Sequence, residues 1–175
     1  MTAQSLDKIK YEGVEYALIG TSDGKLIRPE QFGMEGSMIS TANYNGYIAE
    51  YAITNMKLLL SSFYINERNG HFLPIFGVKS VDGNYKDINH IILFSGTIRI
   101  AKDFIRELYV HMGNQKATAF ETVLDIEVKE GIVVEIEDRS EEVKWKRGAF
   151  KKYFEESDDK TQSIFDSFRF DLNII

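Results

Sequence analysis

FETVLDIEVKEGIVVEIED, residues Phe120 to Asp138, alternates apolar and polar side chains on both sides of a glycine-containing turn. The apolar positions carry even numbers on both sides of that turn: Phe120, Leu124, Ile126, Val128, Ile132, Val134 and Ile136. Because successive side chains of a strand point to opposite faces, a loop of odd length is needed if both sets share one face. The loop Lys129-Glu130-Gly131 meets this requirement, with glycine at the left-handed third position. The stretch therefore predicts a β-hairpin with one apolar face.

A second hairpin is predicted near the N-terminus, where the apolar positions change from odd to even numbers. Only a loop of even length makes that change, and Glu12-Gly13 is a two-residue turn of this kind. It pairs Tyr11 with Val14 on one face of the hairpin and sets Lys10 opposite Glu15 on the other.

A third hairpin is predicted between Phe94 and Met112, again from apolar residues with even numbers. Its loop would be Ala101-Lys102-Asp103, with Asp103 in a left-handed conformation that aspartate tolerates better than most residues. Residues 45–53 and 56–65 read as two further strands, but both faces carry apolar residues and the pattern does not fix their register.

The pattern changes after Asp138, where Val143, Phe150 and Phe154 approach helical spacing. A second helix after Ser157, or a strand from Phe168, are both compatible with the remaining sequence. We therefore predict a single domain of residues 1–175 in the α+β class. Its β-rich part, 1–138, is an antiparallel sheet curled into a sandwich or half-barrel, and one or two helices follow in 139–175.

Composition narrows the functional classes. The 175 residues are 43% apolar, which suits one ordinary core. There is no cysteine, so a disulfide framework or a thiolate nucleophile is excluded. The start of the sequence lacks a leader pattern and no window resembles a membrane span, so we expect a cytoplasmic protein without a membrane partner. A net charge of −6 argues against nucleic-acid binding.

The segments GYIAEYAI, LFSGTIRI, YVHMG and EGIVV together resemble a family of bacterial proteins for which no activity is known. The family pattern runs RGYxAxWxI, WFSGxLRIPxG, YVHMGYxSxYE and IxxGxVV, and the resemblance covers about residues 45–134. The chain departs from this pattern at Asn45, Tyr51, Leu93, Ala101 and Asp103. The resemblance implies a β-rich fold and no mechanism.

Candidate chemistry in the sequence is sparse. The third hairpin would gather a polar patch of Arg99, Glu107, Tyr109 and His111. Acid–base catalysis at His111 would need a tuning neighbour and a pocket that excludes water, so we favour a structural role for this patch. His71, His90 and His111 lack the spacing of metal ligands, and we expect no metal, no cofactor and no enzymatic activity.

Charge is segregated along the chain. Residues 121–142 contain nine acidic side chains against two basic ones, whereas 143–152 contain five basic and no acidic ones. In the predicted register Asp125 faces Glu135, with Glu127 and Glu137 nearby, and opposed like charges destabilise a sheet. The neutralising charge would come from the following helix, through Lys144, Arg147 or Lys151, or from a basic partner protein.

The leading functional hypothesis is a non-catalytic interaction protein that binds a basic partner through Asp125, Glu127, Glu135 and Glu137. An immunity-type inhibitor of a bacterial toxin is one protein of this kind. The first alternative is a small-ligand-binding barrel, because YNGYIAEY and SSFYI are aromatic strands that could line a pocket. The second alternative is an enzyme centred on His111.

Overall fold

The computed structural model describes residues 3–111 and 113–156, the last eight of these by their backbone alone. The strands are β1 (Lys8–Tyr11), β2 (Val14–Thr21), β3 (Tyr47–Thr54), β4 (Lys57–Ile65), β5 (Asn84–Tyr85), β6 (His90–Ile91), β7 (Gly96–Phe104), β8 (Phe120–Lys129) and β9 (Ile132–Asp138). Three short 3-10 helices, η1 (Pro29–Phe32), η2 (Arg106–Leu108) and η3 (Ala117–Ala119), lie between strands. The helix α1 (Ser140–Glu156) follows β9.

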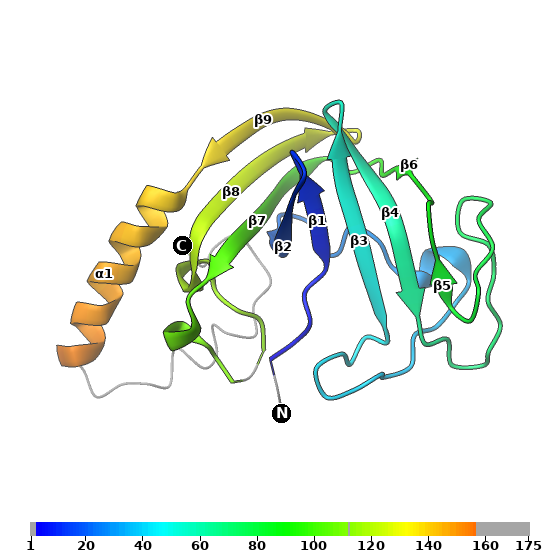
Figure 1. The fold of residues 1–175 in the computed structure, drawn as a ribbon, viewed down its shortest axis with the longest axis horizontal. Coiled ribbons are helices and arrows are strands. Elements are labelled where there is room, and N and C mark those ends of the chain that lie inside the picture. The colour runs from blue at the N-terminus through cyan, green and yellow to red at the C-terminus, as the bar shows by residue number, and fades with distance from the viewer. Residues whose placement is uncertain (1–2, 112, 157–175) are drawn as a thin grey trace.

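Seven strands form a closed sheet in the order β3-β1-β2-β7-β8-β9-β4, because β4 also pairs with β3. The short strands β5 and β6 pair with the edge of β4 that faces away from β3. The molecule is thus a β-rich barrel with one described C-terminal helix, which extends from the end of β9 on the side opposite β5 (Figure 1). A curled sheet is confirmed, and its curling goes as far as a barrel.

One strand pair departs from the expected antiparallel sheet. Strand β1 runs parallel to β3, with Lys8 beside Glu50 and Tyr11 beside Ile53. The odd or even numbering of apolar positions predicts the pairing only of strands that are joined by a tight turn. It does not predict the pairing of β1 with β3, because β2 and the long segment 22–46 separate them in the chain. The prediction of a purely antiparallel sheet is therefore wrong at this pair.

The core fills the inside of the barrel with alternate residues of the main strands. Ile9, Leu58, Ile98, Ile100 and Ile126 are all fully buried there. Large aromatic side chains join them, and burying each apolar side chain of this size contributes about 1.5–3 kcal/mol relative to exposure. Because alternate residues face inward, the residues between them must face outward or be covered by another element.

The first predicted hairpin is confirmed. Tyr11 pairs with Val14, and Lys10 with Glu15. The turn residues have positive φ angles, 50° for Glu12 and 77° for Gly13, which fits a two-residue turn of type I′. The strands β3 and β4 form a hairpin of the same kind around Asn55-Met56.

The β8–β9 hairpin forms, but its predicted loop is wrong. The turn is the two-residue Glu130-Gly131, and Val128 pairs with Val133. Beyond this pair the register shifts by one residue, so that Ile126 faces Ile136. Val133 is 3% exposed, whereas Ile132 and Val134 are 39% and 46% exposed and do not share the core face. A bulge adds one residue to one strand, so the inward-facing positions change between odd and even numbers, as they do across a loop of odd length. The apolar pattern therefore does not distinguish a bulge from an odd loop.

The third predicted hairpin is wrong. Strand β7 continues through Ala101-Lys102-Asp103 and pairs with β2 and β8. Of the residues expected in the returning strand, Phe104 ends β7, Arg106–Leu108 form η2, and Met112 lies outside the described residues. Asp103 has the predicted positive φ, 61°, but near the end of a strand. Its carboxylate accepts hydrogen bonds from Lys102 Nζ (2.8 Å) and Thr122 Oγ1 (3.0 Å), which stabilise this conformation.

The predicted helix over Val143 and Phe150 is confirmed as α1. Fully buried Val143 packs it onto the outer face of the barrel, against a small apolar cluster that includes Ala101 and Val123. The backbone N–H of Ser140 donates to Asp138 Oδ1 at the start of the helix (2.8 Å). The second helix or strand expected after Ser157 lies outside the described residues.

Within the described part of the chain, no helix has the length and apolar character needed to cross a membrane.

Candidate functional site

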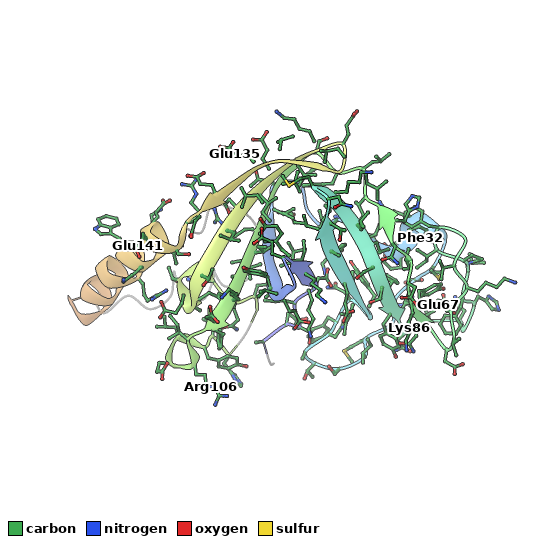
Figure 2. All side chains as sticks on the ribbon, turned by 45° about the horizontal axis from the view of Figure 1, so that its top comes forward. Phe32, Glu67, Lys86, Arg106, Glu135 and Glu141 are labelled. Carbon is green, nitrogen blue, oxygen red and sulfur yellow. The ribbon has the colours of Figure 1, made fainter. Side chains whose placement is uncertain are left out.

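A charged pocket lies on the outer face of β7, β8 and β9, beside the start of α1. It has a volume of about 310 Å³ and is lined by Thr97, Arg99, Asp125, Glu127, Glu135, Glu137 and Arg139. We call these seven residues the acidic pocket. The strand alternation puts them there, because Ile98, Ile100 and Ile126 take the positions that face the core. Glu135 projects from β9 away from the barrel interior (Figure 2).

The floor of the acidic pocket is a buried ion pair. Arg99 Nε donates to Asp125 Oδ1 (2.6 Å) and Arg99 Nη2 donates to Asp125 Oδ2 (2.7 Å). The two residues are only 5% and 8% exposed. A fork of two parallel hydrogen bonds holds both side chains in one geometry. The pair therefore makes the floor of the acidic pocket rigid.

The sequence-based account of Asp125 is wrong in two respects. Asp125 faces Glu137 across the hairpin, and Glu127 is the residue that faces Glu135. The charge of Asp125 is balanced by Arg99 on the neighbouring strand and by Arg139 Nε, which lies 3.3 Å from Asp125 Oδ2. The bulge in β9 accounts for the change of facing residue.

The rim of the acidic pocket carries a surplus of negative charge. Glu127 and Glu135 are directly opposed, an arrangement that costs a few tenths to about 1 kcal/mol. Glu127 has Lys129 at 3.2 Å, and Glu137 has Arg139 at 3.2 Å. Among the described residues Glu135 forms no ion pair. The rim thus keeps an uncompensated carboxylate beside a second one.

The described basic side chains of α1 do not cover this rim, so the expectation is wrong for Lys144 and Arg147. Lys144 lies 3.8 Å from Glu141 of the helix itself. Arg147 binds Glu121 (3.2 Å) and the backbone oxygens of Thr118 and Phe120, at the other end of β8. The side chain of Lys151 lies outside the described residues.

The polar patch predicted around His111 is not assembled as expected. Arg99 lies on β7 and pairs with Asp125. Glu107 lies in η2, and Glu107, Tyr109 and His111 are all exposed. The rings of Tyr109 and His111 are 6.2 Å apart, so these two residues are neighbours. In residues 3–111 and 113–156 no cluster of three or more His, Cys, Asp or Glu side chains is placed to hold a metal ion.

The sequence contains a signal for the buried pair. Arg99 lies between Ile98 and Ile100, and Asp125 lies between Leu124 and Ile126. Both charged residues therefore occupy the face opposite the core isoleucines of their strands, where an arginine and an aspartate can pair if the strands are neighbours. Pairing the two strands directly would have matched Arg99 with Asp125, as observed.

Aromatic residues of β3 and β4 lie inside the barrel. The rings of Tyr47 and Phe63 stack with centroids 5.4 Å apart, and both belong to the core. Tyr51 is 1% exposed, and its hydroxyl has no hydrogen-bond partner among the described residues. Nearby, buried Asp7 accepts the backbone N–H of Ala49 (3.0 Å) through Oδ1. The interior is therefore apolar with a small polar region at Asp7 and Tyr51.

Burial raises the pKa of Asp7 above its ordinary value of 3.8, although Lys25 and the N–H of Ala49 oppose the shift. A carboxyl group whose pKa is raised by folding contributes stability that is complete below pH 3.8 and is lost as pH rises through the folded pKa. We therefore expect the stability of the native chain, relative to Asp7→Asn, to fall as pH rises from about 4 towards 7. Urea unfolding of both proteins across this range measures the difference, and a constant difference would contradict the assignment.

Comparison of the chain with family models, with curated proteins and with solved structures gave no match. A function for this chain must accordingly be argued from its own residues.

Proposed function

We propose that the protein is a non-catalytic interaction protein that binds a basic protein through the acidic pocket. The observation that carries the proposal is the directly opposed pair Glu127 and Glu135, next to the buried pair of Arg99 and Asp125. A lysine or arginine side chain placed between the two glutamates would remove their repulsion and form charge-assisted hydrogen bonds. A pocket of about 310 Å³ has room for such a side chain.

An immunity-type inhibitor is the form of this function that the charge pattern favours. Such an inhibitor must meet a basic toxin quickly, and a surface of one charge accelerates the encounter with a partner of opposite charge. The carboxylates of Glu127, Glu135 and Glu137 lie on one face and are exposed or half-buried, so a partner can approach them.

The test is a pull-down from the source cell with the full chain and a triple variant, Glu127→Gln, Glu135→Gln and Glu137→Gln. We expect the native chain to retain a basic protein and the variant to lose it, with association rates that fall as salt is raised. Asp125 is left unchanged because its loss would leave Arg99 buried without its partner.

A matched control removes the same charge elsewhere, through Glu30→Gln, Asp82→Asn and Asp87→Asn, which are exposed positions in η1 and on either side of β5, away from the strands that carry the acidic pocket. The control should bind the basic protein as the native chain does. Equal retention by the native chain and by the Glu127, Glu135 and Glu137 variant at low salt would overturn the proposal.

A second candidate function is the binding of a small polar ligand inside the barrel. The observation that favours it is the buried Tyr51 hydroxyl without a partner among the described residues, close in the fold to the Asp7 carboxylate. A ligand present at a hundred times its dissociation constant adds roughly 2.7 kcal/mol to the free energy of unfolding. Thermal-shift screening with metabolites should then detect a compound that stabilises the native chain and not Tyr51→Phe. Equal stabilisation of both proteins, or of neither, counts against this function.

A further inference from the structure

The edge of β9 that faces away from β8 is open along most of the strand. Its pairing with β4 is limited to Ile132 opposite Lys57, and the N–H of Val133 donates to Met56 O (2.8 Å). From residue 134 to 138, no described strand pairs with this edge. Figure 1 shows β9 at the upper margin of the barrel, beside β8 and leading into α1.

The backbone groups that this edge presents follow from the ladder on its other side. The N–H of Arg139 donates to Val123 O (2.9 Å), which puts these two residues at the position of a hydrogen-bonded pair, although the N–H of Val123 itself donates to Ser140 Oγ (3.1 Å). In an antiparallel ladder such pairs alternate, so Glu137 and Glu135 also direct their backbone groups towards β8. Ile136 and Asp138 direct their N–H and C=O groups outward. An extended segment placed beside β9 would find two donors and two acceptors in the spacing of a strand.

The side chains of β9 determine which segment fits this edge. Glu135 and Glu137 lie on the outer face, and half-buried Ile136 lies on the face that meets the core. Side chains of an added strand would lie about 4.5–5.5 Å from those of β9 on the same face. Basic side chains are therefore required at every second position, with apolar ones between them.

Charge also decides which of three segments fits this edge: one from a second copy of the chain, the segment 157–175, or one from another protein. A second copy of the chain would bring its own Glu135 and Glu137 against the same pair. The segment 157–175 contains four acidic and two basic residues, so it too carries net negative charge. A basic segment of another protein is the occupant whose charge complements the edge. Charged residues on edge strands also prevent unspecific pairing, and here they would exclude acidic segments while admitting basic ones.

We propose that the basic partner binds by adding an extended segment, in which lysine or arginine alternates with apolar residues, to the open edge of β9. This inference rests on the proposed function and specifies the part of the partner that is recognised. Backbone hydrogen bonds to Ile136 and Asp138 hold the segment in register, and its basic side chains reach Glu135 and Glu137 at the rim of the acidic pocket.

The test uses synthetic peptides with the full chain. The parent peptide alternates lysine with valine or threonine, and two derivatives carry N-methyl groups on one or the other set of alternate residues. Only one set of N–H groups faces β9, so one derivative should bind about tenfold more weakly or worse and the other should bind like the parent. Amide exchange at Ile136 and Asp138 should slow when the parent peptide is bound.

Charge and composition are controlled separately. A permuted peptide with its lysines in one block should bind more weakly than the parent, and Glu135→Lys with Glu137→Lys should shift the preference to a peptide that alternates glutamate with valine. Equal binding of the parent, both methylated peptides and the permuted peptide would overturn edge addition while leaving the proposed function standing. Absence of any peptide binding also overturns edge addition. Failure of the proposed function has a different signature, namely partner retention by the charge-neutral triple variant.

Discussion

Replacing Arg99 with methionine is expected to lower the free energy of unfolding by about 3–5 kcal/mol. The substitution leaves the carboxylate of Asp125, which is 8% exposed, with the longer 3.3 Å contact to Arg139 in place of the paired hydrogen bonds from Arg99. The expected loss of stability is electrostatic and not a loss of packing, since methionine keeps most of the volume of the arginine side chain. Urea denaturation at neutral pH measures the effect.

A double variant identifies the cause of this loss. Arg99→Met with Asp125→Leu removes both charges, and buried ion pairs replaced by apolar residues of similar volume are often neutral or more stable. The double variant should therefore recover most of the stability that Arg99→Met loses. Lys8→Met is the matched control, because Lys8 and Glu15 form an exposed pair at 2.9 Å that contributes about 1 kcal/mol at most. A double variant as unstable as Arg99→Met would show that packing, and not the unpaired carboxylate, is responsible.

Gly131→Ala is expected to destabilise the fold more than Gly13→Ala, although both glycines occupy the same position of a Glu-Gly turn. Their φ angles are 81° and 77°, so the conformational cost is similar, about 1 kcal/mol or slightly more. A Cβ at Gly13 would meet nothing within 4 Å, whereas one at Gly131 would lie 2.5 Å from the backbone oxygen of Ile92. Relief of that overlap adds about 1–3 kcal/mol.

The comparison of these two variants is a direct measurement of the contact between the β8–β9 turn and segment 92–94. Gly131 N–H donates to Phe94 O (2.9 Å), and the backbone must shift to admit a side chain. Denaturation midpoints of the two variants, with unchanged dependence on denaturant, give the difference. Equal losses for both variants would mean that the turn moves freely away from Ile92.

The parts of the fold that the sequence predicts are those with a local cause. The turn at Glu12-Gly13 follows from parity, and α1 follows from the spacing that places Val143 on the barrel. The β8–β9 loop was misassigned because a bulge and an odd loop change parity in the same way. The third hairpin failed because apolar residues after Phe104 keep even numbers while the chain leaves the sheet through η2.

The grouping of the acidic side chains was predicted, but the residues that face one another were not. Asp125, Glu127, Glu135 and Glu137 lie together on the outer side of the hairpin, as the charge pattern suggested, and the pocket that they line was not predicted. Their facing partners were wrong by the one residue of the bulge. Arg99 was assigned to a patch with His111, because its true neighbour belongs to a strand that no turn connects to β7. Contacts of this kind depend on strand order, and local periodicity contains no information about it.

Closure of the barrel between β9 and β4 involves, in the described residues, one register pair and two backbone hydrogen bonds, Leu58 N–H to Gly131 O and Val133 N–H to Met56 O. This seam is the weakest line of the cylinder, because every other junction of the ring is a ladder of several pairs. Breaking these two hydrogen bonds opens the barrel between β9 and β4 and leaves the hydrogen bonds of every other strand pair intact. Fluctuation at the seam is consequently the least costly route by which solvent reaches the interior.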